Sequence, residues 1–425
     1  MRLLIKNGRV IDPSSGTDDT LDILLEKGKI VEVKARIENK EAKIIDASRL
    51  VVAPGFIDMH VHLRDPGQEE KETLATGSRA AAKGGFTSIA CMPNTNPVND
   101  NRGVTEYILS EAKKRAVVNV FPVAAITKGL RGEELTDMAD LEEAGAVAFS
   151  DDGHPVGNSQ TMRRALEYSK LLNTLIIDHC EDRSLSGEGV MNEGYYSYLF
   201  GLRGIPDSSE EIMVARDILL AQKAEARIHI AHLSVKGAVD LVKEAKKKKV
   251  KVTAEVTPHH LFLTDACLET YDTNLKVNPP LRSKEDTQAL IQAIKEGVVD
   301  VFATDHAPHT ADEKDVEFDI APFGICGLET AVSLLLDKLV NKNVISLQRF
   351  IQMSSTTPAL LLGLENKGKI CPGADADLTI LNLHKEIVVD VKAFKSKSRN
   401  NPFHGWKLRG AAVMTIVGGK IVSSS

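Results

Sequence analysis

The central part of the chain alternates between short apolar runs and segments with helical periodicity, and this alternation constrains the fold more than any other feature. Eight strand-then-helix units over roughly 300 residues predict a TIM-like (β/α)8 barrel. In such a barrel the active site lies at the C-terminal ends of the strands. A doubly wound open sheet is the alternative, but no Gly-x-Gly-x-x-Gly follows the first run. The runs begin near Val51, Phe86, Val117, Ala146, Thr174, Ala226, Lys251 and Val298, and helical segments include Glu69–Lys83, Glu133–Ala144, Ser208–Ala224 and Val235–Lys248.

The two ends of the chain read as short strands separated by turns that contain glycine or asparagine. Neither end has enough apolar residues to form a core alone. We therefore expect residues 1–52 and 366–425 to pack together as one small composite β domain, a β-sandwich. Residues 53–365 then form the catalytic barrel, inserted between the two halves of that domain.

Composition places the chain among ordinary soluble globular proteins. It has 425 residues, of which 43% are hydrophobic and 26% charged, with a formal net charge of -6. That charge predicts neither nucleic acid nor an anionic membrane as a partner. We find no run of about 20 apolar residues and no signal peptide, so no membrane span is expected. The five cysteines are widely spaced without a Cys-x-x-Cys pair, which predicts a reducing cytoplasm rather than a disulfide framework.

Two histidines stand two residues apart in Gly55–Arg64, just after the apolar run Leu50–Ala53. Alternate residues of a strand share one face, so His60 and His62 can converge on one metal ion. Arg64 has the same parity and could meet an anionic substrate just above that metal. Taken alone, the pair is also compatible with two polar residues at a strand end.

Histidine or a carboxylate recurs at the predicted ends of most other strands. Because parallel strand ends meet at one edge of a barrel, such residues are expected to converge there. Imidazole and carboxylate ligands suit Zn²⁺ or a similar divalent ion, and two ions bridged by a carboxylate would use all of them. His229, His259, His260 and His306 also suit structural roles, and His154 fits either role. The polar residues at the strand ends are Asn94 (second), Asp151, Asp152 and His154 (fourth), His179 (fifth), His232 (sixth), and Asp305, His306 and His309 (eighth).

Together these residues resemble the class I dihydroorotases of the amidohydrolase superfamily, over essentially the whole chain. A segment common to many amidohydrolases, Lys369–Leu378 (KICPGADADL), says little about substrate. The specific motifs are Asp58–Gly67 (DMHVHLRDPG), Met92–Thr95 (MPNT), Asn278–Arg282 (NPPLR) and Ala303–His309 (ATDHAPH).

The resemblance implies a metal-ligand set. His60, His62 and Asp305 would hold a first Zn²⁺, and His179 and His232 a second. Related hydantoinases bridge the ions with a carboxylated lysine from the fourth strand, but no lysine occurs between Gly129 and Ser169. Class I dihydroorotases use an aspartate, which by the motif is Asp152 rather than Asp151.

The resemblance also implies the reaction, the reversible cyclisation of N-carbamoyl-L-aspartate to L-dihydroorotate in pyrimidine biosynthesis. Asp305 would be the general base and acid. Arg64 could bind the substrate carboxylate bidentately, although a surface salt bridge with Asp65 is the plainer reading. Asn94 would assist, unless it is only a turn residue. The other substrate contacts implied are His309, Asn278, Phe323 and Gly324.

Two segments and two alternatives complete the expectations. The acidic segment 310–322 is predicted to be a flexible loop over the site, and the insertion 181–207 to shape its entrance. A hydantoinase or dihydropyrimidinase would share the fold, but its substrates lack the carboxylate that Arg64 would bind. A non-catalytic subunit of an aspartate carbamoyltransferase complex should lack some of the ligands, and this chain has all of them. We expect a homodimer, and association with aspartate carbamoyltransferase stays open.

Overall fold

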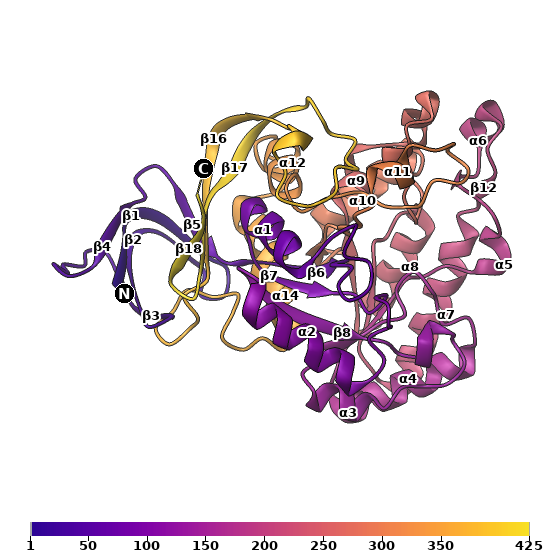
Figure 1. The fold of residues 1–425 in the computed structure, drawn as a ribbon, viewed down its shortest axis with the longest axis horizontal. Helices are drawn as coiled ribbons and strands as arrows, with labels where there is room; N and C mark the ends of the chain where they lie inside the picture. Colours follow the sequence, from indigo (N-terminus) through magenta and orange to yellow (C-terminus); the bar gives the residue numbers. More distant parts are fainter. Residues whose placement is uncertain (1, 425) are drawn as a thin grey trace.

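The computed structural model describes residues 2–424 and consists of a parallel barrel with a strand-rich sheet at one end (Figure 1). The barrel strands follow the chain in the order β6-β7-β8-β9-β10-β13-β14-β15. A parallel bridge between Val61 and His306 brings the last strand region back to the first. The predicted barrel is therefore confirmed. Its strands are β6 (Phe56–Val61), β7 (Phe86–Cys91), β8 (Asn119–Ala124), β9 (Ala148–Phe149), β10 (Ile176–Asp178), β13 (Ile228–Ile230), β14 (Val252–Val256) and β15 (Val301–Phe302).

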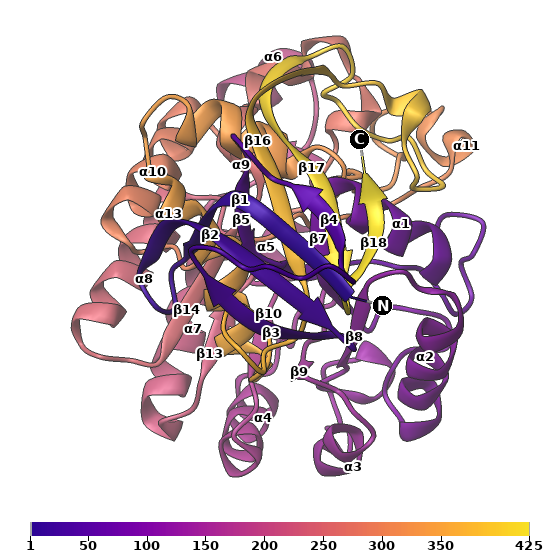
Figure 2. The same cartoon turned by 90° about the vertical axis from the view of Figure 1, so that its left-hand side faces the viewer.

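Helices surround the barrel strands, as Figure 2 shows from the side of the terminal sheet. The helix predicted over Ser208–Ala224 has those bounds, and the one expected over Val235–Lys248 is Lys236–Lys247. The longer helices are α1 (Leu74–Gly84), α2 (Arg102–Arg115), α4 (Ser159–Leu172), α7 (Ser208–Ala224), α8 (Lys236–Lys247) and α10 (Lys284–Glu296). Shorter elements are α3 (Met138–Glu143), α5 (Arg183–Ser186), β11 (Met191–Asn192), α6 (Tyr195–Phe200), β12 (Gly204–Ile205), α9 (Pro258–Phe262), α11 (Ala311–Lys314), α12 (Ala331–Leu335), α13 (Leu347–Ile351) and α14 (Thr357–Leu361).

Both chain ends build the second sheet, as predicted. In Figure 1 the indigo N-terminal strands lie beside the yellow C-terminal strands. The sheet order is β18-β17-β16-β5-β1-β2-β3, with β4 paired to β1. Its strands are β1 (Arg2–Asp12), β2 (Thr17–Glu26), β3 (Lys29–Lys34), β4 (Lys43–Asp46), β5 (Val51–Pro54), β16 (Leu378–Val388), β17 (Lys407–Val417) and β18 (Lys420–Ser424).

The first barrel strand begins at Phe56 and not near Val51, which corrects one detail of the prediction. The run Val51–Pro54 is β5, which pairs with β1 and β16 of the terminal sheet. Gly55 separates it from β6, and a Cβ at Gly55 would lie 2.1 Å from the Thr87 hydroxyl oxygen. Only glycine fits this close approach, so the chain leaves one sheet and enters the other at that residue.

Alternation along the strands divides the barrel core into two layers. Ile176 packs in the large cluster shared with the surrounding helices. Its neighbour Ile177 packs in a separate cluster with Ile57, Met59 and Leu361 of α14. Because apolar side chains fill most of the barrel interior, the candidate ligands lie in the last residues of the strands or just beyond them. None of the helices among residues 2–424 combines the length and the apolar character that crossing a membrane requires.

Candidate metal centre and substrate pocket

The six residues predicted as metal ligands come together at the carboxyl end of the barrel, and all are buried. They arrive from five strands, because the ends of neighbouring parallel strands meet at one edge. His60 lies in β6 and His62 just beyond it, Asp152 follows β9, His179 follows β10, His232 follows β13, and Asp305 follows β15.

The first group consists of His60, His62 and Asp305, with Asp152 facing it. The Nε2 atom of His62 lies 3.1 Å from Asp305 Oδ1 and 3.4 Å from Asp152 Oδ2. The Nε2 atom of His60 lies 3.2 Å from Asp152 Oδ1 and 3.6 Å from Asp305 Oδ1. These atoms lie close enough to share one cation.

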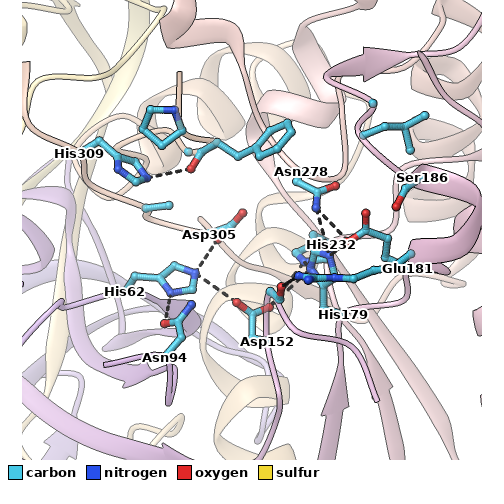
Figure 3. Close-up of a pocket in the computed structure, with 18 of the residues that line it drawn as sticks. His62, Asn94, Asp152, His179, Glu181, Ser186, His232, Asn278, Asp305 and His309 are labelled. Carbon is cyan, nitrogen blue, oxygen red and sulfur yellow. Dashed lines mark hydrogen bonds and ion pairs between the residues drawn. The ribbon is translucent and has the colours of Figure 1, made fainter. Parts of the chain in front are cut away.

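The second group consists of His179 and His232, with the same Asp152 beside them (Figure 3). The Nδ1 atom of His179 is 2.8 Å from His232 Nε2. Both nitrogens face Asp152 Oδ1, at 3.7 Å and 3.8 Å. The carboxylate of Asp152 therefore stands between the two groups, with Oδ1 toward His60, His179 and His232 and Oδ2 toward His62.

Three buried atoms of the candidate ligands have no hydrogen-bond partner among the described residues, namely His60 Nε2, Asp152 Oδ1 and His232 Nδ1. The first two face each other at 3.2 Å. An unpaired buried polar atom is costly, and two that face each other are satisfied by a cation between them. Burial opposes ionisation of Asp152, but the neighbouring histidines, His60 foremost, hold its pKa well below the usual range. The donor set and its electrostatics fit a divalent metal of the zinc type.

Three candidate histidine ligands each have a polar partner at the ring nitrogen that faces away from the centre. The sequence analysis did not predict the two carboxylates among these partners. Glu255 of β14 accepts from His60 Nδ1 at 2.6 Å, and Glu181 accepts from His179 Nε2 at 3.2 Å. Asn94 accepts from His62 Nδ1 at 2.9 Å. Each contact places the ring proton away from the centre and leaves the other nitrogen's lone pair for a metal. The sequence did hold a signal for Glu255, because it is the one carboxylate within the strand Val252–Val256.

Three site residues adopt the left-handed backbone region, which L-residues rarely occupy. The φ angles are 61° at Arg64, 28° at His232 and 46° at Asp305. Such strain persists where the surrounding structure imposes it, and it is concentrated at functional sites. Here all three residues lie just beyond the ends of barrel strands and line the pocket described below.

A pocket of about 440 Å³ opens above the centre. All the residues predicted to contact substrate line it: Arg64, Asn94, Asn278, His309, Phe323 and Gly324. Arg64 is only 9% exposed, and its Nε donates to the Pro308 carbonyl. Asp65 instead accepts from the Leu74 amide and the Tyr107 hydroxyl, so the plainer reading of Arg64 as its surface salt-bridge partner is wrong.

The upper wall of the pocket is held together by Asn400, a residue that the sequence did not single out. Its side-chain amide donates to the carbonyls of Ala307 and Gly324, and its carbonyl accepts from the His309 amide. His309 Nε2 donates to the Phe323 carbonyl at 2.9 Å. Asn400 thus joins the segment after β15 to the one that carries Phe323 and Gly324.

The insertion 181–207 contributes to the pocket wall through Glu181, Arg183 and Ser186, among other residues. Glu181 also accepts from Asn278 Nδ2 at 3.1 Å, which connects this insertion to the opposite wall. The predicted role of the insertion in shaping the entrance agrees with this placement.

The five histidines that the sequence left open, His154, His229, His259, His260 and His306, do not line the pocket. His154 is exposed and does not line the pocket. His229 contacts Thr253 and Glu255, and His306 contacts Glu72. The imidazole of His260 contacts Thr257 and the Pro279 carbonyl. These partners fit structural roles.

Comparisons with known proteins agree with this architecture. Residues 48–238 match the family model described as dihydro-orotase-like, and residues 338–423 match the amidohydrolase family. A dihydroorotase of Pelotomaculum thermopropionicum is 54% identical over 99% of this chain and 98% of its own length. One of Geobacter metallireducens is 52% identical over 99% of both. Among solved structures, an L-hydantoinase (dihydropyrimidinase) from Arthrobacter aurescens has a TM-score of 0.90 at 27% identity, covering 99% of this chain and 96% of that one.

Proposed function

The chain belongs to the dihydroorotases, metal-dependent cyclic amidohydrolases, and on that premise we propose that its pocket interconverts N-carbamoyl-L-aspartate and L-dihydroorotate with Zn²⁺ at the His/Asp centre. This is the ring-closing step of pyrimidine biosynthesis. The reaction needs a polarised carbonyl, an activated nucleophile, a group that carries a proton, and a cationic site for the free carboxylate.

Two Zn²⁺ ions are proposed, with His60, His62 and Asp305 holding one and His179 and His232 the other. Asp152 would bridge them, because its two oxygens face both groups. When bound, zinc supplies Lewis acidity, which acidifies water and polarises a carbonyl. Glu255, Glu181 and Asn94 keep the ligand imidazoles in the required orientation and tautomer.

Asp305 would move the proton. In hydrolysis its carboxylate accepts the proton of the attacking water and delivers it to the ring nitrogen that leaves. In ring closure it takes the proton of the ureido nitrogen as that nitrogen attacks the carboxylate carbon, and it returns this proton to the carboxylate oxygen, whose bond to carbon breaks as water leaves. Asp305 suits this role because its carboxylate lies beside His60 and His62, and because it also lines the pocket.

The observation that carries the proposal is the unpaired buried charge of Arg64. Among residues 2–424 its guanidinium has no carboxylate partner, and its described contacts are the Pro308 carbonyl and His309 Nε2. A buried cation that lines a pocket without a counterion favours an anionic ligand. Dihydroorotate and carbamoyl aspartate carry such a carboxylate, whereas hydantoin and dihydrouracil do not.

Purified protein loaded with zinc tests the proposal in one assay. It should consume dihydroorotate far faster than dihydrouracil or hydantoin, with close to two zinc ions per chain. Asp305→Asn is the matched inactive variant, and its circular dichroism should equal that of the wild type. Turnover of dihydrouracil with none of dihydroorotate would contradict the proposal.

The proposal extends to the compartment and to the partners of the protein. All five cysteines are free, which fits a reducing cytoplasm. We propose a homodimer, which light scattering on the purified protein tests directly. Adding purified aspartate carbamoyltransferase to the same measurement tests whether the two enzymes associate.

A further inference from the structure

Residues 310–324, here called the 310–324 loop, lie between two cavities. On one side is the substrate pocket, which Phe323 and Gly324 line. On the other side is a second cavity of about 470 Å³, lined by residues 271–274, 309–311, 314–316 and 399–400. Phe318, in the middle of the loop, packs in a buried apolar cluster. The segments on either side of it, which border the two cavities, are also held by specific polar contacts.

Lys276 supplies one set of these contacts from outside the loop. Its side chain is only 2% exposed, and its ammonium donates to the carbonyls of Phe318 and Asp319 at 2.8 and 2.9 Å. The same ammonium lies 4.7 Å from the centre of the Phe323 ring, a cation–π contact. The Lys276 carbonyl accepts from the Gly324 amide at 2.8 Å. One residue thus holds the middle and the end of the loop.

Lys314 supplies the second set from within the loop. Its side chain is 7% exposed, and its ammonium donates to the Thr273 carbonyl at 2.9 Å and the Pro322 carbonyl at 2.7 Å. The Thr273 hydroxyl in turn donates to the Lys314 carbonyl at 2.5 Å. The two lysines therefore cross-link the 310–324 loop to the segment 271–276 in both directions.

Neither ammonium forms an ion pair with a carboxylate among residues 2–424. Burial lowers the pKa of Lys276 to about 8. Burial, and then the charge of Lys276, lowers the pKa of Lys314 to about 7. Both shifts show that burying the charge is unfavourable, and apolar side chains of similar volume often serve stability better. The hydrogen bonds to loop carbonyls are what an apolar side chain could not make.

We propose that Lys276 and Lys314 are positioning residues that anchor the 310–324 loop against the substrate pocket, so that they set substrate affinity rather than the rate of the chemical step. The inference deepens the proposed function and rests on it for the identity of the substrate. Phe323 and Gly324 would present their backbone to the ring only while both anchors hold.

Lys276→Met and Lys314→Met test the anchor with a kinetic and a structural measurement. Each variant should raise KM for dihydroorotate at least about tenfold, while kcat changes less than about threefold and zinc content stays at the wild-type value. Endoprotease Glu-C should cleave after Glu317, which is exposed in the loop, faster than in the wild type. Lys314→Arg, which keeps the charge and donors, should recover part of the affinity.

The exposed Lys248, at the C-terminal end of α8, offers the matched control Lys248→Met, which should change neither measurement. Wild-type KM and wild-type protease resistance in both methionine variants would overturn the proposal. A fall in kcat at unchanged KM would overturn it as well. If a methionine variant fails to fold, Thr273→Val removes the hydroxyl contact to Lys314 and should raise the cleavage rate. Because cleavage needs no substrate, the anchor is tested even if the enzyme acts on another ring.

Discussion

The floor of the pocket, formed by the candidate metal ligands, and its upper wall are built in different ways. The floor consists of side chains that lie in a barrel strand or within a few residues of its end, and these contact one another directly. The upper wall consists of loop segments that touch through backbone carbonyls, with His309, Lys276 and Asn400 as donors. The positions of the floor residues are therefore set by the barrel strands, whereas the position of the wall depends on a few polar contacts.

This difference separates the expected effects of mutation. Changes in the floor should affect metal binding and the chemical step, because each ligand has its place set by a strand. Changes in the wall should affect substrate affinity or local stability, because under the proposed function the wall would contact the substrate and not the metal.

The neighbouring aspartates after β9 provide the sharpest test of the floor. Asp152→Asn should lower kcat by more than about 100-fold, which exceeds the usual cost of changing a residue behind a ligand. It should also lower zinc content. Asp151 points away, and its carboxylate accepts from the Ile126 and Thr127 amides at 2.7 and 3.0 Å. Asp151→Asn should therefore lose stability but keep its zinc. The reverse pattern of metal content would show that the bridge was assigned to the wrong aspartate.

A substitution at Glu255 tests whether the residues that hydrogen-bond to the candidate ligands contribute to metal affinity. Glu255→Gln removes the charged acceptor of His60 Nδ1 and should weaken zinc affinity by about 10- to 100-fold, measured by competition with a chelator. Glu210 is a matched control, since it is a buried carboxylate that contacts Ser234 and no candidate ligand. Equal losses in Glu210→Gln would mean that the effect comes from general destabilisation.

Arg64 tests the wall. Arg64→Gln should raise KM for dihydroorotate by roughly 10- to 100-fold, because a charged hydrogen bond to the carboxylate is lost. Zinc content should not change. The control is Arg183→Gln, since Arg183 also lines the pocket but is exposed. If Arg183→Gln weakens binding more than Arg64→Gln, the carboxylate binds elsewhere.

His309 should give the smallest effect, visible as a dependence of stability on pH. Burial, and then the charge of Arg64, lowers the pKa of His309 to about 3, whereas an unfolded histidine titrates near 6.5. Below pH 6.5 the unfolded chain thus binds a proton that the folded chain does not. Its stability contribution is complete above pH 6.5 and declines as the pH falls toward 3. Between pH 6.5 and 4.5 the free energy of unfolding, measured by chemical denaturation, should fall by about 2 kcal/mol more in the wild type than in His309→Gln. Parallel curves for the two proteins would contradict this assignment.

Much of the fold was predictable because it depends on local patterns. Alternating apolar and amphipathic segments indicate strand-helix units, and the helix over Ser208–Ala224 was predicted with its observed bounds. The exchange of Val51–Pro54 into the terminal sheet was not predictable. Both sheets need a buried apolar run there, and only the pairing of β5 with β1 and β16 decides between them.

The sequence by itself determined which residues could form the floor of the site. His60, His62, Asp152, His179, His232 and Asp305 stand at or near strand ends, and a parallel barrel brings all such ends to one edge. Only the tertiary structure decided their partners and the upper wall. Glu255, Asn400, Lys276 and Lys314 act through contacts with residues distant in the chain, such as that between Asn400 and Gly324. Such contacts depend on how the loops pack over the barrel, and local sequence periodicity does not predict that packing.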